Sequence, residues 1–496
     1  MPVPAPASRD RALAVLLSLP PACYLLWRLH RRLLRVYDPA LADVLDAWAT
    51  LSPSAAAAVA TLAESSCDRA AFEVAKAQGL STGSQRPLGA MVPVANGRAP
   101  RSVFRFAHPE SGATVAWRNV YSLPVEYDVE LCPRLLDPAA SDALALRGLP
   151  SGGKRRRFVV IDANVHGLYQ QQLQRYFAAH AVECHLCVIS GEEPEKRWRQ
   201  VETVLEALCA FGLHRREPIV AVGGGCVLDI VGLAASLYRR GVPFIRVPTT
   251  LLAIVDAAVG VKNGVDWVSD AKGPLKNRVG TFYGPAGALC DVSFIATQDA
   301  RNLVNGLGEV MKLALVRSPE LFGILEAHGA ALVACKFQSA EPALKAAAAR
   351  VIELGIEIML EELGPNLWEY KLERCVDYGH TFSKIIEMQP EPYVMHGEAV
   401  NIDGAFCAVL ANRRGMLSDA DLARVFAAMR AVGLPTENPH MYELDILDKA
   451  CSDAVEHRHG AQRIPLLTGI GSSRCVSDIT REELEGARVA FKAMHA

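Results

Sequence analysis

The 496-residue sequence lacks a surplus of either charge, because 52 Lys and Arg residues offset 54 Asp and Glu residues. It also lacks a long basic run, the usual footprint of a surface that binds nucleic acid. Its thirteen cysteines lie between Cys23 and Cys475 without the spacing of a disulfide framework. We therefore expect no nucleic-acid partner, and we expect reduced thiols in a cytosol-like compartment.

A long uninterrupted apolar run is missing as well. The most apolar segment, residues 12–27, is shorter than the roughly 20 residues of a spanning helix, and Pro20 and Pro21 interrupt it. Its basic stretch, residues 28–35, follows the apolar part, whereas a secretory signal carries its positive charge first. We expect a packed N-terminal helix in a cytoplasmic protein without membrane association. An organelle-targeting or membrane-associated amphipathic leader is the alternative.

What is present is a 51% apolar chain, long enough to form the cores of two or three domains. Residues 1–110 form an Ala-rich extension without a chemical motif. In residues 111–297, short apolar runs alternate with helical stretches, which predicts an α/β domain with a parallel sheet. Residues 298–496 have mostly a helical period, which predicts a second, largely helical domain. The cleft between two such domains is the natural place for a ligand.

A glycine-rich turn follows the strand predicted at residues 218–222. Gly223, Gly224 and Gly225 precede a predicted helix and allow a close backbone approach to a phosphate. The N–H groups and partial positive charge of the helix start favour a pyrophosphate. Taken alone, the same pattern also fits a plain tight turn.

Polar residues interrupt the apolar segment that comes next. Asp256 and Lys262, if isolated, would form a surface ion pair worth about 0–1 kcal/mol. The clustering of Lys262 with Lys276, Asn277 and Arg240 instead favours a site for a phosphorylated, hydroxyl-rich molecule.

Three potential metal ligands form the most specific pattern: Glu309, His380 and His396. Two imidazoles and one carboxylate, with positions left open, are the ligand set of a catalytic zinc-type site. A lone histidine on a helix is more often a core or surface residue, but each of these three lies beside a glycine or within a polar break.

Two further groups have ordinary explanations. Cys184 and Cys187 could bind zinc or act in redox chemistry, but no second pair exists and they lie in a strand-like run, so we predict core packing. His457, Arg458 and His459 either close on a phosphate or belong to a solvated loop.

The order and spacing of these motifs resemble those of dehydroquinate synthases, over about residues 113 to 470. The matching features are the glycine turn with Asp229, the Pro-Thr-Thr-Leu-Leu segment 248–252, Asp256 six residues before Lys262, Glu309 three before Lys312, and His396 sixteen beyond His380.

The resemblance implies a dehydroquinate synthase-like fold, with an α/β NAD-binding domain followed by a mostly helical domain that binds metal and substrate. It implies a homodimer and a divalent ion, zinc or cobalt, held by Glu309, His380 and His396. The implied NAD contacts are Asp162, Asn164, Glu193, Lys196, Gly223, Gly224, Gly225, Asp229, Thr249 and Thr250. The implied catalytic and substrate contacts are Asp256, Lys262, Lys276, Asn277 and Lys312, with Arg240 reaching the phosphate in the neighbouring subunit.

Departures from this pattern indicate the branch of the family. Glu373, Asp377 and Lys384 stand where dehydroquinate synthases have Arg, Asn and His. Two added carboxylates would repel a substrate carboxylate, whereas a neutral sugar chain tolerates them. Residues 361–369, 376–383 and 463–471 are similar to sedoheptulose 7-phosphate cyclases. We therefore expect a cyclase of the 2-epi-5-epi-valiolone synthase type.

The expected reaction is that of a phosphate-eliminating carbon–oxygen lyase in cyclitol biosynthesis. Oxidation, phosphate elimination, reduction and intramolecular aldol closure would follow one another, with NAD used catalytically. Lys384 stands where these cyclases usually have Pro, so a desmethyl-4-deoxygadusol synthase and a 3-dehydroquinate synthase remain alternatives. A catalytically idle NAD-binding homologue and an iron-type alcohol dehydrogenase are opposed by the intact ligands and by the phosphate-directed cations.

Overall fold

The computed structural model describes residues 91–93, 103–107, 111, 113–119, 124–149, 155–271, 273–389 and 391–495. The chain divides into two compact units, residues 1–124 and 125–496. In the first unit, an antiparallel sheet has the order β1 (Met91–Pro93), β2 (Val103–Ala107) and β3 (Thr114–Asn119). The predicted N-terminal helix lies outside the described residues. Within the described ranges, no helix is long and apolar enough to cross a membrane.

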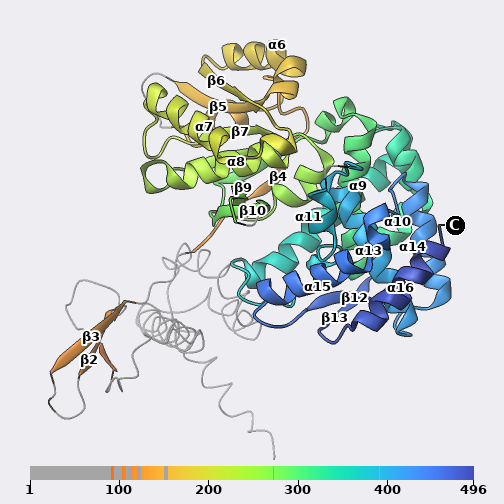
Figure 1. Cartoon of the computed structure of the whole chain (residues 1–496). Coiled ribbons are helices and arrows are strands. Elements are labelled where there is room, and N and C mark those ends of the chain that lie inside the picture. Colours follow the sequence, from red (N-terminus) through yellow and green to blue (C-terminus); the bar gives the residue numbers. More distant parts are fainter. Residues whose placement is uncertain are drawn as a thin grey trace, which may run out of the picture. The chain divides into compact units, whose positions relative to one another are not determined.

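The second unit begins with the predicted parallel sheet, which has six strands (Figure 1). All of its strand pairings are parallel, in the order β4-β11-β8-β7-β5-β6. The strands are β4 (Val129–Leu131), β5 (Arg156–Asp162), β6 (Glu183–Ile189), β7 (Ile219–Gly223), β8 (Phe244–Pro248) and β11 (Gly287–Cys290). Because β7, β8 and β11 are buried throughout, the sheet is covered on both faces, as its continuous apolar runs require.

Helices cover the sheet according to the alternation of side chains along each strand. In β5, Val159 and Ile161 pack with residues of α6 (Ala163–Ala179). Phe158 and Val160 face the opposite way and pack with residues of α7 (Trp198–Phe211) and α8 (Gly225–Leu237). The carboxyl ends of β5, β7 and β8 therefore open onto helix starts, where polar groups gather in α/β proteins.

Short elements join the sheet to the helical part. A π-helix, η5 (Ala253–Ala257), follows β8, and an antiparallel hairpin of β9 (Lys262–Ser269) and β10 (Gly273–Phe282) comes after it. The hairpin register shifts between Leu275 and Val279, so Lys276 and Asn277 lie at an irregularity. Short helical segments make up α5 (Ala143–Leu146), η3 (Glu193–Glu195), η4 (Tyr238–Arg240) and η6 (Val292–Thr297).

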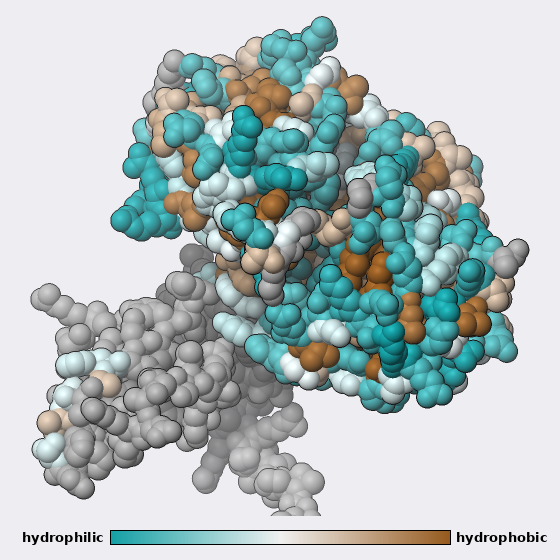
Figure 2. Space-filling model, in the orientation of Figure 1, coloured by the Kyte–Doolittle hydropathy of each residue, from teal (hydrophilic) through white to brown (hydrophobic). Residues whose placement is uncertain are grey.

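The rest of the second unit is mostly helical, as predicted. Its helices are α9 (Ala300–Arg317), α10 (Pro319–Ala334), α11 (Pro342–Leu363), α12 (Ser383–Glu387), α13 (His396–Arg413), α14 (Asp419–Ala431), α15 (Leu444–His457) and α16 (Arg481–Ala493). Single turns η7 (Gly364–Asn366), η8 (Cys375–Asp377) and η9 (Pro439–Tyr442) and a hairpin of β12 (Ile464–Gly469) and β13 (Ser472–Val476) complete it. We call residues 125–297 the sheet half and residues 298–495 the helical half. Hydrophilic residues dominate the visible face of both halves, with smaller hydrophobic areas (Figure 2).

Helix α13 is the centre of the helical half, since residues 397–411 are all buried. It lies against α9 with almost no space between the backbones. A Cβ atom on Gly397 would stand 1.9 Å from the Asn305 carbonyl oxygen, and one on Gly308 would stand 2.1 Å from the Gly397 carbonyl oxygen. Only glycine fits at these two positions, and the close crossing brings Glu309 on α9 beside His396 on α13.

Candidate active site

Three side chains predicted as metal ligands meet at the crossing of α9 and α13. Nε2 of His396 lies 3.4 Å and Nε2 of His380 lies 3.6 Å from Oε1 of Glu309. One ligand atom from each residue lies within 4.8 Å of the others. Two ligand atoms bound to a tetrahedral ion at about 2.1 Å stand about 3.4 Å apart. The spacing therefore fits a divalent ion of the zinc type.

The second ring nitrogen of each histidine faces an oxygen that can only accept. Nδ1 of His380 lies 3.0 Å from the Tyr378 carbonyl oxygen, and Nδ1 of His396 lies 2.8 Å from Oε1 of Glu387. Each Nδ1 therefore carries a proton, so that any lone pair available to an ion is the one on Nε2, toward Glu309. Burial and the nearby Lys312 hold the pKa of His380 well below its usual range, so this ring is neutral, as a metal ligand must be.

Glu309 is buried, and it is balanced by an ion pair with Lys312 one turn further along α9. Burial alone would raise its pKa, but Lys312 and the two histidines hold it well below the usual value. Asp256 on η5 faces the same group, and its pKa is raised by burial and by Glu309, against the opposing effect of Lys312. A π-helical turn often marks a functional site. The pairing of Asp256 with Lys262 as an isolated surface pair is not observed, because Lys262 Nζ lies 3.1 Å from Glu369 instead.

Two buried polar residues hold the loops that carry the ligands. Asn305, one turn before Glu309, accepts the N–H of Gly397 at 2.7 Å and so fixes the start of α13. Asp403 accepts three consecutive N–H groups directly after His380, those of Thr381, Phe382 and Ser383, at 2.8, 2.6 and 2.9 Å. Sequence reasoning missed both, because a polar residue in an apolar helix shows its partner only after folding.

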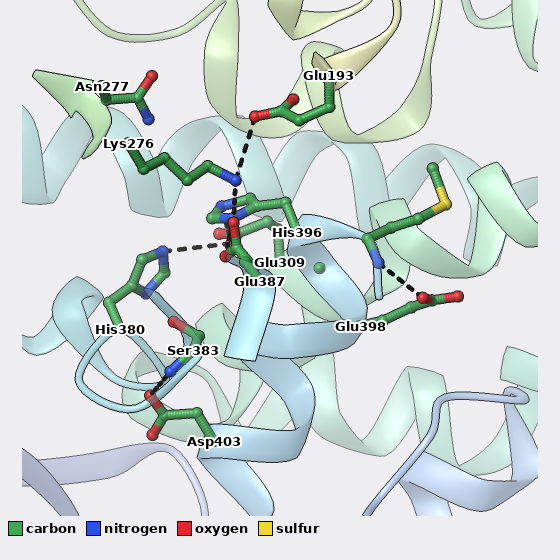
Figure 3. Close-up of polar contacts among 12 residues, drawn as sticks. Glu193, Lys276, Asn277, Glu309, His380, Ser383, Glu387, His396, Glu398 and Asp403 are labelled. Atoms are coloured by element: carbon green, nitrogen blue, oxygen red, sulfur yellow. Dashed lines mark hydrogen bonds and ion pairs between the residues drawn. The ribbon is translucent and has the colours of Figure 1, made fainter. Parts of the chain in front are cut away.

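Lys276 links the ligand group to the sheet half (Figure 3). Its Nζ lies 3.1 Å from Glu193 on η3 and forms an ion pair with Glu387 at the end of α12. Burial opposes ionisation of Glu193, but Lys276 and Lys196 lower its pKa to about 2. Glu387 is the most informative residue missed, since only its proximity to His396 and Lys276 distinguishes it from an ordinary helix glutamate.

The glycine turn lies where β7 meets α8. A Cβ atom on Gly223 would stand 2.8 Å from Cβ of Val227 and 3.2 Å from Cβ of Asp162, so this position requires glycine. Gly224 is the N-cap of α8 and supplies no side-chain cap. The first N–H groups of α8 therefore remain available for a phosphate.

The other predicted dinucleotide contacts surround this turn. Asp162 caps α6 by accepting the N–H groups of Asn164 and Val165, and Asn164 itself is exposed. Lys196 is buried and lies 2.6 Å from Asp229 and 2.7 Å from Asn277. Thr249 donates its N–H to the Gly223 carbonyl oxygen, and the Thr250 hydroxyl accepts the N–H of Ala253.

One predicted contact does not join this group. Arg240 ends η4, after the 13 residues of α8, and is exposed. A 13-residue helix is about 20 Å long, so Arg240 lies far from the glycine turn of its own chain.

Glu373, Asp377 and Lys384 depart from the dehydroquinate synthase pattern, and their surroundings modify the effect of their charges. Asp377 is held by Arg374 at 3.1 Å and Arg458 at 3.7 Å, and the side chain of Glu373 is 71% exposed. The two gained carboxylates are thus paired or solvated, and the repulsion of a substrate carboxylate stays a prediction. The residue Lys384 is exposed overall, but partial desolvation of its ammonium group, with nearby Arg458 and Lys262, lowers its pKa against the effect of Asp377.

Two further predicted groups lie outside the ligand group. Cys184 and Cys187, on β6, pack on opposite faces of the sheet, so they cannot share a metal, and core packing is confirmed. His457 accepts a hydrogen bond from Arg278 at 3.4 Å and lies at the exposed end of α15.

Comparison with known proteins agrees with the geometry. Family models described as 3-dehydroquinate synthase N-terminal and C-terminal match residues 186–305 and 306–454. A 2-epi-5-epi-valiolone synthase from Streptomyces hygroscopicus subsp. jinggangensis is 47% identical over 376 residues, which cover 75% of this chain and 88% of that protein. A demethyl-4-deoxygadusol synthase from Trichormus variabilis is 38% identical over 344 residues, 69% of this chain and 82% of that protein.

A solved structure shows the same arrangement of elements. ValA, a 2-epi-5-epi-valiolone synthase from Streptomyces hygroscopicus subsp. jinggangensis 5008 with NAD+ and Zn2+ bound, matches with a TM-score of 0.70 and 46% identity. The match covers 76% of this chain and 100% of that chain.

Proposed function

This chain belongs to the 3-dehydroquinate synthase family of sugar-phosphate cyclases, and we propose that it cyclises sedoheptulose 7-phosphate as a 2-epi-5-epi-valiolone synthase. In this proposal it is a carbon–oxygen lyase that releases inorganic phosphate. The observation that carries it is the ligand group of Glu309, His380 and His396, which lies across Lys276 from Glu193 beside the glycine turn. The higher identity to valiolone synthases than to the demethyl-4-deoxygadusol synthase supports the branch.

Both cofactors have residues that fit them. Glu309, His380 and His396 would hold zinc or cobalt, and the start of α8 would hold the pyrophosphate of NAD, with Asp162, Glu193, Lys196, Asp229, Thr249 and Thr250 around it. When bound, the ion lowers the pKa of substrate hydroxyls, and NAD accepts and returns a hydride.

The charged side chains of the site would orient the sugar phosphate through its successive changes. Oxidation of one hydroxyl acidifies the neighbouring C–H, its proton is removed as phosphate leaves, reduction restores the alcohol, and the opened chain closes by aldol addition. Lys312 and Asp256, both beside Glu309, would bind substrate hydroxyls. Lys262, Lys276 and Asn277, on the hairpin, would bind the phosphate end.

A homodimer would complete the site. Because Arg240 lies about 20 Å along α8 from the glycine turn of its own chain, it would serve the phosphate site of a neighbouring subunit.

The test is to incubate the purified chain with NAD, zinc or cobalt, and sedoheptulose 7-phosphate. We expect phosphate release and a cyclitol product whose mass and NMR spectrum match 2-epi-5-epi-valiolone. A deoxygadusol-type product would move the chain to the sister branch. Turnover of the dehydroquinate precursor alone would refute the substrate assignment, and no turnover of either compound by metal-loaded, NAD-bound protein would favour an idle homologue.

A further inference from the structure

We propose that Glu387 is a positioning residue that fixes the tautomer and orientation of His396 and connects the metal-ligand group to the sheet half through Lys276. The inference rests on the proposed function in one respect, namely that His396 binds the ion. Glu387 itself is not a ligand of the proposed ion, because His396 lies between it and Glu309.

Both carboxylate oxygens of Glu387 are engaged by different donors. Oε1 lies 2.8 Å from Nδ1 of His396, and Oε2 forms the ion pair with Lys276. The side chain is only 3% exposed, and a buried carboxylate is stable only when it is paired and hydrogen-bonded. The ionised group can only accept, so it holds the proton on Nδ1 and directs the Nε2 lone pair toward Glu309.

The backbone of α12 explains why Glu387 reaches this position. Asp403 holds its first residue and the two residues before it, because it accepts the N–H groups of residues 381–383. Asp403 and His396 are seven residues apart on α13, about two turns, and so lie on one face of that helix. Helix α12 therefore bridges that face, with its start bound to Asp403 and its last residue bound to His396 (Figure 3).

Lys276 connects Glu387 to the sheet half. Its side chain is 12% exposed and lies between Glu387 in the helical half and Glu193 in the sheet half. The negative charge that orients His396 is thus balanced by a cation from the β9–β10 hairpin. A change in Glu387 should consequently alter ion binding before any substrate is present.

The test is the affinity of the Glu387→Gln variant for Zn2+, measured by competition with a chromophoric chelator in the absence of substrate. Glutamine keeps the volume and one acceptor oxygen, so the fold should persist, which thermal unfolding of the metal-free protein checks. We expect a dissociation constant about 10- to 100-fold higher than that of the unsubstituted chain. The absorption spectrum of the Co2+-loaded variant should also change, because the orientation of one imidazole ligand is relaxed.

Glu398→Gln is the matched control. Glu398 is also a buried carboxylate, two residues after His396, but it pairs with Arg301 and accepts the Met395 N–H. We expect its Zn2+ affinity to stay within about twofold of the unsubstituted chain, whatever the change in thermal stability.

The outcomes separate this inference from the proposed function. Unchanged Zn2+ affinity in Glu387→Gln, or equal weakening in both variants, would overturn the role of Glu387 and leave the metal site standing. If the unsubstituted chain binds no Zn2+, or if His396→Ala binds it as tightly, the proposed metal site itself fails, and the inference fails with it.

Discussion

The sheet half and the helical half build their binding groups from different parts of the chain. In the sheet half the decisive features are backbone ones, namely the glycine turn and the uncapped start of α8. In the helical half they are side chains, and behind each histidine stands an acceptor that orients it. A backbone site depends on space and tolerates changes in side-chain chemistry, whereas a side-chain site depends on the identity of every partner. Substitutions should therefore weaken binding for different reasons in the two halves, by filling space in the sheet half and by removing a specific partner in the helical half.

The largest effect is expected from removing a ligand in the helical half. His396→Ala should reduce phosphate release on the order of 1,000-fold or more, because two ligands hold a divalent ion weakly. NAD binding, followed by its fluorescence or by calorimetry, should change little, since no backbone of the sheet half moves. Equal loss of NAD binding would show that the two halves do not act as separable sites.

The next effect concerns the residue that orders the His380 loop. Asp403→Ala should lower the free energy of unfolding by about 2–5 kcal/mol, because three buried N–H groups lose their acceptor. Chemical denaturation measures this loss. Asp403→Asn keeps an acceptor oxygen and should be less damaging. Similar stability of both variants and the unsubstituted chain would contradict the role of Asp403.

A smaller effect, confined to the sheet half, is expected at the glycine turn. Gly223→Ala places a Cβ atom 2.8 Å from Cβ of Val227, which should cost about 1–3 kcal/mol of stability and raise the Kd for NAD. The Zn2+ affinity should remain unchanged, as chelator competition can check. Gly167→Ala is the control, because a Cβ there meets nothing within 4 Å.

The smallest expected effect is on the pH dependence of stability, through Glu193 and its ion pair with Lys276. The pKa of Glu193, about 2, lies below its ordinary value of 4.5, so its ion pairing stabilises the fold above pH 4.5 and is lost as pH falls toward 2. With about a third of its side chain exposed, the contribution is about 1–2 kcal/mol after solvent screening. Glu193→Gln should thus narrow the difference in unfolding free energy between pH 6 and pH 3. An unaltered acid slope would show that the pairing with Lys276 contributes nothing.

Much of the catalytic unit could be predicted because its signals are local. The continuous apolar runs of β7 and β8 indicate buried parallel strands, and the helical period of residues 298–496 indicates the second half. The ligand triad was found because His380 and His396 lie beside glycines. Glu387, Asn305 and Asp403 could not be found in this way, because their significance depends on which groups folding brings within hydrogen-bond distance.

The surroundings of the two gained carboxylates, Glu373 and Asp377, also could not be predicted from the sequence. The sequence counts both as added negative charge, but in the folded chain Arg374 and Arg458 approach Asp377, while the side chain of Glu373 is largely exposed. Electrostatic energy depends on the distance between charges and on their burial, and neither can be read from the sequence alone.

By itself the sequence determined the sheet with its helices, the glycine turn, the three candidate ligands and the family, since each follows from residue type and spacing along the chain. Only the tertiary structure decided which nitrogen of each histidine faces Glu309, which carboxylates are neutralised, and how Lys276 joins the two halves. Hydrogen bonds and ion pairs act over a few ångströms. Their partners here, such as Glu193 and Glu387 around Lys276, are many residues apart in sequence and meet only when α9, α12, α13 and the hairpin have packed.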